Sequence, residues 1–515
     1  MKKTIIFIMV LVLMFSLISC QTDKNDNKKI EAVGSDKNNS DTQKIKKDSV
    51  VIYSGMSPRT LDQHDSTDVS TAILIRNLYA NLYRLDVNGK IVPELAKSYK
   101  VNSDYTKYTI TLKDGLKFSD GSPLTARDVA YSYERGMKSE VTYYEILKSV
   151  KAKNDNTVEI VLKDPNNSFL NDLTVEYMCV MSKNAIQDGM DVAKLPTVTS
   201  GAYTVVKWEK DKSIELKANP YYLGGEPSIK NAEIVYKLSE ENAYTALKNG
   251  SIDYIASATT KEVPYLKADD NIELMSYDNL AWKFLSLNQR KKELADEKVR
   301  RAIYYALDLN YIIDSALDGM GTPAPIMVNG SIAGYIHGCE KTEFNLKKAK
   351  KYMAESAYPD GFDLTIEAGS DEYEKVAEEI KILLSQIKIK VKIKKKELNK
   401  VLDDMYSFKY EAALISYSMS SGNVSHVAPM FKKGNTLNFA SSKDGRIGEL
   451  LEKSIAVKEE QRNTVLKKAY KLMKEQNIYI GLYWPTIYDA KNIALKQKEE
   501  VNSEKFIIAN MYWDI

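Results

Sequence analysis

Cysteine and histidine are scarce in this sequence, with three of each among 515 residues. Cys20 lies near the start, which leaves Cys179 and Cys339 for the rest of the chain. A fold of this size with two remaining cysteines cannot depend on a disulfide framework. Because the two lie far apart in the chain, we expect separate buried thiols. No cluster of histidine and cysteine surrounds His426, so we expect neither a metal site nor a cofactor.

The signatures of common catalytic sites are also missing. The sequence contains no phosphate-binding GxxxxGK[ST], no GxSxG and no HExxH. Residues 319–324 (GMGTPA) superficially match a dinucleotide-binding turn. However, Pro323 and Pro325 would obstruct the helix that must follow such a turn, and no strand leads into it, so we predict a loop. We therefore expect that the protein is not an enzyme.

The sequence also has no large excess of basic over acidic residues, or of acidic over basic ones. The 73 basic and 70 acidic residues leave a formal net charge of +3. A nucleic-acid-binding protein normally concentrates basic residues on one face, so this balance argues against a nucleic-acid partner. Residues 387–393 alternate Ile or Val with Lys, which predicts a strand with one solvated face.

The first twenty residues are the most informative stretch. A basic start precedes an uncharged apolar run from Ile5 to Ile18, which is too short to span a bilayer comfortably but suits a signal peptide. The run ends in LISC, which resembles a bacterial lipobox. We expect a signal peptide at 1–19, acylation of Cys20 and a polar, flexible tether through residue 48. No later segment is long and apolar enough to cross a membrane.

The folded part mixes strands and helices without a repeat, which predicts an α/β fold. Period-two patterns predict strands at 49–53, 108–112, 157–162, 203–206 and 214–216. Helices are predicted at 125–136, with Thr125 as N-cap, and at 296–309. The DG dipeptides at 114–115 and 120–121 have the chemistry of tight turns.

Nine sequence blocks carry a family resemblance. In chain order they are LDQH (61–64), NLYRLD (81–86), PELA (93–96), LKDGLKFSDG (112–121), LTARDV (124–129), SGAY (200–203), NPYY (219–222), ALKNGSID (246–253) and VRRA (299–302). The chain resembles the family-5 solute-binding proteins of ABC transporters, which include oligopeptide, dipeptide and nickel receptors. Two departures are Gln63, where the family has proline, and SGAY in place of its GxGPY. His64 in the first block is expected to be a structural hydrogen-bonding residue.

The resemblance implies a periplasmic-binding-protein-like fold of class II (cluster C), in which two lobes close on a hinge and an accessory domain is added. By analogy, residues 49–77, 199–285 and 476–515 form lobe I, 78–198 the accessory domain and 286–475 lobe II. The lobes would be joined near residues 285–286 and 479–481. A ligand that contacts both lobes only in the closed state favours closure.

The resemblance also implies where a ligand lies. An extended peptide would pair by backbone hydrogen bonds with two strands, which correspond to residues 67–69 and 416–418. The ligand-binding residues implied are Thr67, Asp68, Val69, Ser416, Tyr417, Ser418, Ser420, Asn423 and His426. The family's aspartate for the peptide amino terminus is replaced by Ser420, and a hydroxyl cannot neutralise a buried ammonium. Either Asp68 or another acid replaces it, or the ligand lacks a free amino terminus.

Function is expected to follow the family. We expect a monomer on the outer face of the cell membrane, lipid-anchored, that delivers peptides to the transmembrane subunits of an ABC permease. One alternative is binding of nickel or a metal chelate, with His426 as a ligand, because imidazole suits divalent nickel. Another is a surface receptor that senses peptides without transport.

Overall fold

Strands and helices intersperse along the whole described chain, which confirms the predicted α/β class. The computed structural model describes residues 47–65, 68–86, 89–238, 242–419, 422–498 and 506–515. The predicted signal peptide, Cys20 and nearly all of the tether lie outside these residues. Thr67 and Ser420 also lie outside them.

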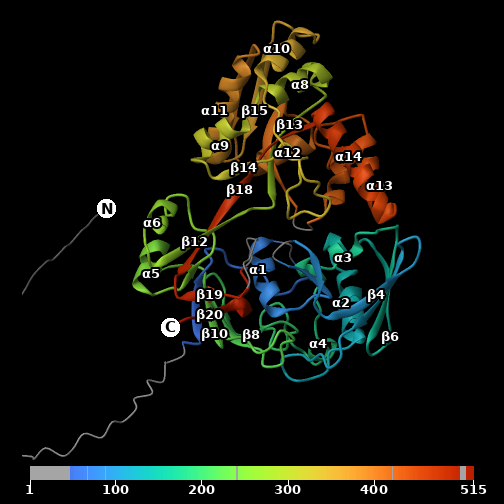
Figure 1. Ribbon diagram of the computed structural model, residues 1–515, viewed down its shortest axis with the longest axis vertical. Coiled ribbons are helices and arrows are strands. Elements are labelled where there is room, and N and C mark those ends of the chain that lie inside the picture. Colours follow the sequence, from blue (N-terminus) through green and yellow to red (C-terminus); the bar gives the residue numbers. More distant parts are fainter. Residues whose placement is uncertain (1–46, 66–67, 87–88, 239–241, 420–421, 499–505) are drawn as a thin grey trace, which may run out of the picture. The chain divides into compact units, whose positions relative to one another are not determined.

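One mixed sheet of 12 strands forms the framework (Figure 1). Its main path runs β16-β15-β17-β13-β18-β11-β1-β10-β9-β8, and β12 and β14 also pair with β18. The bounds are β1 Ser49–Tyr53, β8 Tyr203–Glu209, β9 Ser213–Ala218, β10 Asn231–Val235, β11 Tyr254–Ile255, β12 Ile272–Asp278, β13 Ala281–Leu287, β14 Gly321–Pro323, β15 Phe362–Ala368, β16 Ile389–Lys395, β17 Ala412–Ser418 and β18 Tyr479–Asn492.

Four of the predicted strands lie in this sheet. β1 has the predicted bounds, and β8, β9 and β16 overlap theirs. The lysines of β16 are exposed, as expected for a strand with a solvated face. The loop predicted at 319–324 is wrong in part, because Gly321–Pro323 form β14 and pair with residues 483–485 of β18. A strand of three residues carries too little pattern to be read from sequence.

The strand β13 shows how the sheet is covered on both faces. Side chains alternate across a strand, so Trp282 and Phe284 point to one face of β13, and Leu285 and Leu287 point to the other. Trp282 and Phe284 belong to a core shared with η3, α12, α13 and α14. Leu285 and Leu287 belong to a core shared with α8, α9, α10 and α11.

Smaller sheets complete the fold. A four-stranded antiparallel sheet has the order β4-β5-β7-β6, and β2-β3 and β19-β20 form two-stranded ribbons. The bounds are β2 Tyr83–Leu85, β3 Ile91–Pro93, β4 Ala96–Val101, β5 Lys107–Leu112, β6 Leu147–Asn154, β7 Thr157–Leu162, β19 Leu495–Gln497 and β20 Met511–Trp513. β7 has the predicted bounds.

Helix ends follow the capping residues. Thr125 caps α2 in a capping box with Asp128, as predicted at the N-cap. The helix predicted at 296–309 ends earlier, because Asp308 accepts from the Tyr311 amide and begins a second helix. The α-helices are α1 Val69–Leu78, α2 Ala126–Gly136, α3 Phe169–Asp172, α4 Lys183–Gln187, α5 Ala243–Asn249, α6 Val263–Lys267, α7 Lys292–Ala295, α8 Glu297–Ala306, α9 Leu309–Leu317, α10 Leu346–Ala354, α11 Asp371–Ser385, α12 Leu398–Tyr406, α13 Arg446–Ala456 and α14 Glu459–Gln476.

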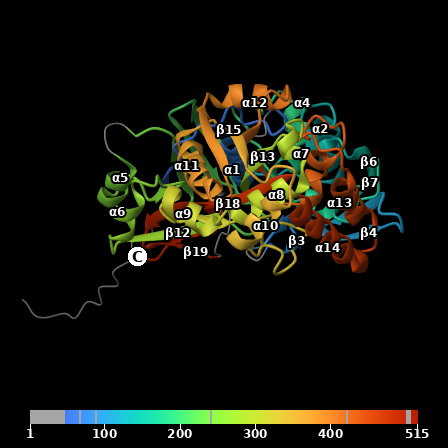
Figure 2. The same cartoon turned by 90° about the horizontal axis from the view of Figure 1, so that it is seen from above.

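Four 3₁₀ segments supplement these helices: η1 Thr142–Tyr144, η2 Glu176–Met178, η3 Val424–Phe431 and η4 Ile508–Asn510. Helices α13 and α14 pack against each other, as do α8 and α10 (Figure 2). Within the part of the chain that is described, no helix combines the length and apolarity needed to cross a bilayer. Cys179 and Cys339 are separate free thiols, as expected; Cys179 is buried, whereas Cys339 is only half-buried.

Candidate functional site

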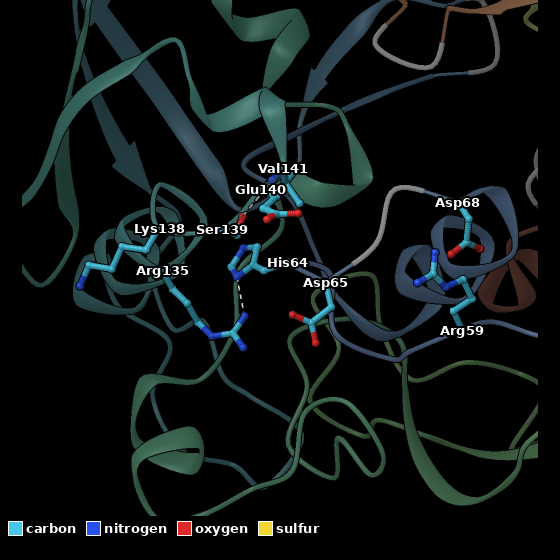
Figure 3. A pocket seen from close by; sticks show the side chains of 9 residues that line it. All are labelled: Arg59, His64, Asp65, Asp68, Arg135, Lys138, Ser139, Glu140 and Val141. Atoms are coloured by element: carbon cyan, nitrogen blue, oxygen red, sulfur yellow. Dashed lines mark hydrogen bonds between the residues drawn. The ribbon is translucent and has the colours of Figure 1, made fainter. Parts of the chain in front are cut away.

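A cavity of about 870 Å³ lies between the loop that follows β1 and the segment at the end of α2 (Figure 3). The loop contributes Arg59, His64, Asp65 and Asp68, and the α2 side contributes Arg135 and residues 138–141. Its charged lining residues are three cations and three carboxylates, namely Arg59, Arg135, Lys138, Asp65, Asp68 and Glu140. The cavity therefore offers both signs of charge to a ligand.

A buried ion pair fixes one wall of this cavity. Arg135 Nη1 donates to Asp62 Oδ1 at 2.8 Å, and Nη2 donates to Oδ2. The Asp62 side chain is 4% exposed. Burial alone would raise the pKa of Asp62, but Arg135 and the backbone amide of His64 hold it below its usual value. A bidentate pair of this kind sets the direction of the guanidinium as well as its charge.

His64 continues the same network. Its Nδ1 lies 2.6 Å from Arg135 Nη1 and accepts from it, so Nε2 carries the hydrogen and faces the Tyr144 hydroxyl at 2.8 Å. Tyr144 in turn donates to the Tyr177 carbonyl. Burial, and then the charge of Arg135, lower the pKa of His64 to about 3. His64 is therefore neutral at physiological pH, and the prediction that it is a structural hydrogen-bonding residue is confirmed.

Asp68 is the N-cap of α1, so the strand predicted at 67–69 is wrong for the described residues. Its Oδ1 accepts from the Thr71 amide at 2.9 Å and from Ser70 Oγ at 2.5 Å, and its Oδ2 accepts from Thr71 Oγ1 at 2.8 Å. Val69 is the first residue of the helix and is exposed. The carboxylate of Asp68 is thus committed to the helix N-terminus, where it is favoured by the helix dipole.

Asp65 is the acid that this cavity leaves most available. Its side chain is exposed and points into the cavity between His64 and Arg59 (Figure 3). Its backbone amide donates to the Asp62 carbonyl at 3.2 Å, and its carboxylate forms no hydrogen bond or ion pair with another described residue. Partial burial, and then the charge of Asp62, raise the pKa of Asp65. A positive group placed beside it would reverse that effect.

The strand β17 carries a second group of predicted residues. It pairs with β13 over its whole length, with Tyr417 opposite Trp282. On its other side it pairs with β15 only at Ala412 and Ala413. From Leu414 to Ser418, no described strand is paired along that second edge. Ser416 and Ser418 are exposed, while Tyr417 is half-buried against the core beneath.

Asn423 and His426 lie around η3. Asn423 is fully buried, and its Oδ1 accepts from the amide and hydroxyl of Ser425 as the N-cap of η3. His426 Nε2 lies 3.1 Å from Asp172 Oδ1 of α3, and the His426 side chain is 30% exposed. Within the described residues, no three His, Cys, Asp or Glu side chains are grouped closely enough to hold a metal ion.

The structure thus divides the predicted site residues among three places. Asp68 lines the cavity beside α1, residues 416–418 lie on β17, and Asn423 and His426 lie at η3. The sequence reasoning missed Arg59, Asp65, Arg135, Lys138 and Glu140. No local pattern marks these residues, because they are brought together by contacts between segments some 70 residues apart in the chain.

Comparisons with known proteins agree with this architecture. Residues 90–438 match the model of the bacterial extracellular solute-binding proteins, family 5, middle region. The glutathione-binding proteins GsiB of Escherichia coli K12 and Salmonella typhimurium are each 28% identical over 355 residues, which is 67% of this chain and 69% of theirs.

Solved structures show the same fold. HbpA2 from Haemophilus parasuis has a TM-score of 0.81 at 22% identity, covering 91% of this chain and 100% of that one. The periplasmic binding protein DppA from Helicobacter pylori, in complex with the peptide STSA, has a TM-score of 0.72 at 24% identity, covering 91% and 98%. NikZ from Campylobacter jejuni, in complex with Ni(L-His), has a TM-score of 0.72 at 22% identity, covering 91% and 100%.

Because the family model spans more than half of the chain, this protein belongs to the family-5 bacterial extracellular solute-binding proteins. It is a solute-binding protein of the type that serves ABC importers, with the α/β periplasmic-binding-protein fold that the sequence predicted.

Proposed function

We propose that this protein captures short peptides with free termini and presents them to the transmembrane subunits of an ABC permease. It acts as a monomer, held at the outer face of the cell membrane by acylated Cys20. It performs no bond chemistry, needs no cofactor and has no nucleic-acid partner. The ligand lies in a cleft between lobe I (49–77, 199–285 and 476–515) and lobe II (286–475), with residues 78–198 as the accessory domain.

The open edge of β17 is the observation that carries this proposal. A strand edge presents alternating N–H and C=O groups, and an extended peptide can add to it as a further strand. Residues 414–418 offer such an edge, because no described strand is paired with them on that side. Backbone pairing gives affinity with little dependence on side chains. A solute without a peptide backbone could not use this edge.

The charges of the cavity beside α1 support a zwitterionic ligand. Because Asp68 is committed to capping α1, the peptide ammonium is assigned to Asp65, with Glu140 as the second acid. These acids replace the carboxylate that the family places at the position of Ser420. Arg59 and Lys138 are available to a carboxylate of the ligand. Glutathione, which the similar GsiB proteins bind by name, is itself a tripeptide with both kinds of charge.

Titration calorimetry tests this function. Tri-, tetra- and pentaalanine, glutathione and Ni(II)–histidine are titrated separately into the mature protein after unfolding and refolding to remove bound ligand. We expect micromolar or tighter binding of at least one alanine peptide. Binding of the nickel chelate alone, lost in His426→Ala, would overturn the proposal in favour of metal-chelate uptake. Uptake of the bound peptide by cells with and without the gene then separates transport from sensing.

A further inference from the structure

A second cavity, of about 1030 Å³, lies at the carboxyl ends of three parallel strands. β1 is central, β10 pairs with it on one side and β11 on the other, and the chain passes from β10 through α5 to β11. The cavity is lined by the residues that end or follow these strands, including Tyr53, Tyr236 and Ala256. In open α/β sheets, ligands bind at such a reversal of strand order, outside the carboxyl ends.

Aromatic side chains dominate this second cavity. Its lining includes Tyr53, Tyr236, Tyr244 and Tyr265, together with Met56. The rings of Tyr244 and Tyr265 lie 5.9 Å apart, and Tyr265 is 63% exposed. Tyrosine rings exposed together offer large apolar faces to another ring, and aromatic pairs are favourable beyond the area that they bury. These rings suit a planar apolar group, although the lining also includes Lys237, Lys261 and Glu262.

Tyr236 adds a buried polar group to this lining. The residue is only 8% exposed, and its hydroxyl has no hydrogen-bond partner among the described residues. A buried hydroxyl without a partner is unfavourable, so such groups are rare unless a ligand or water completes them. A carbonyl oxygen brought into the cavity would accept from this hydroxyl. The lining thus combines aromatic rings with a buried donor that no described residue satisfies.

The second cavity adjoins the first along a single loop. Ser54 to Met56 line the second cavity, and the loop reaches Arg59 in the first only three residues later. The Cα atoms of Met56 and Arg59 are therefore at most about 11 Å apart. Ser70 Oγ donates to Asp68 Oδ1 at 2.5 Å and lies 3.2 Å from the Ser57 carbonyl oxygen, so it holds the two parts of the loop close together. An extended peptide advances about 3.3 Å per residue, so three or four residues bridge that distance.

We infer that this cavity is a subsite for an aromatic side chain of the bound peptide, with the Tyr236 hydroxyl donating to a ligand carbonyl. This inference rests on the proposed function and adds a preference to it. Because three or four residues bridge Arg59 of the first cavity and Met56 of the second, a peptide whose amino terminus lies in the first cavity beside Arg59 would place an aromatic residue here at about the third to fifth position. Backbone pairing at β17 is indifferent to side chains, and this subsite selects among the peptides that pair there.

Calorimetry with a matched peptide series tests the subsite. Pentaalanine is compared with three pentapeptides that carry one phenylalanine at position three, four or five. We expect one of the three to bind about five-fold tighter than pentaalanine, the order of one aromatic pair. Tyr265→Ala should abolish this ratio. Pentaalanine binding with no gain at any position overturns the subsite alone, whereas failure of every peptide to bind overturns the proposed function and the subsite together.

Tyr236→Phe provides the second arm, with Tyr304→Phe as the matched control. Each variant removes a buried hydroxyl that has no partner among the described residues, so neither should lower the free energy of unfolding. Only Tyr236→Phe should weaken binding of the preferred phenylalanine peptide, by about five-fold, the worth of one hydrogen bond. Equal affinities of the two variants for that peptide would overturn the role of Tyr236.

Discussion

Arg135 and Asp62 form a bidentate ion pair in which the aspartate side chain is only 4% exposed. Asp62 precedes the cavity-lining loop residues His64 and Asp65, and Arg135 stands at the end of α2. The pair therefore joins two segments that are 73 residues apart in sequence. It fixes one wall of the cavity to which we assign the charged groups of the ligand.

Replacing Arg135 by methionine should destabilise the protein by about 3 kcal/mol or more, because the buried carboxylate of Asp62 loses its partner. Arg127→Met is the matched control, since Arg127 and Asp155 form an ion pair whose side chains are 68% and 61% exposed. That change should cost less than about 1 kcal/mol. Denaturant unfolding at pH 7.5 measures both. Similar losses for the two variants would contradict the assigned role of the buried pair.

Lowering the pH should reduce the free energy of unfolding through protonation of His64. Its pKa is about 3 in the folded protein against an ordinary value of 6.5, so between these pH values the unfolded chain binds a proton that the folded one does not. Its stabilising contribution is complete above about pH 6.5 and is lost as the pH falls toward 3, at up to about 1.4 kcal/mol per unit. Asp62, whose pKa is also depressed, adds a loss at lower pH.

His64→Gln isolates the histidine contribution, because glutamine does not titrate. Free energies of unfolding measured from pH 7.5 to 4.5 should fall less steeply in this variant than in the wild-type protein. Parallel curves would show that the proton uptake of His64 does not differ between the folded and unfolded states.

Asp65→Asn should weaken binding of peptides with a free amino terminus by about ten-fold or more, since the ammonium loses a charged partner in a partly desolvated site. The affinity for the same peptides with an acetylated amino terminus should change little. Calorimetry on both peptide forms measures the effect. An equal loss for free and acetylated peptides would mean that Asp65 does not recognise the ammonium.

Cys20→Ala should release the protein from the membrane. Two acyl chains anchor a protein stably where a single chain does not, and this substitution removes the acylation site. Cell fractionation and labelling with a palmitate analogue follow the outcome. Continued membrane association of an unlabelled Cys20→Ala protein would contradict the lipid anchor.

Sequence patterns predicted the local structure where a segment carries one clear pattern, such as alternation or a capping box. β1 and β7 alternate regularly and were predicted with their observed bounds, and Thr125 has a capping-box aspartate three residues later. The strand predicted at 67–69 was wrong because it was taken from the family resemblance, whereas the local sequence favours a helix N-terminus at Asp68. Asp68 precedes the apolar periodic residues of α1, which is the pattern of an N-cap.

The site could be predicted only in part, for a physical reason. The family resemblance placed residues 416–418 on a strand, and they lie in β17. Arg59, Arg135, Lys138 and Glu140 were not foreseen, since their convergence depends on the buried Asp62–Arg135 pair. A long-range ion pair leaves no periodicity in either segment that contributes to it.

The central claim is that a peptide pairs through its backbone with the open edge of β17. The most direct test is calorimetry with the best-binding pentapeptide and two analogues, N-methylated at odd or at even amides, because methylation removes a donor without removing a charge. The account predicts a loss of about ten-fold or more in at least one analogue. Unchanged affinity in both analogues would contradict it.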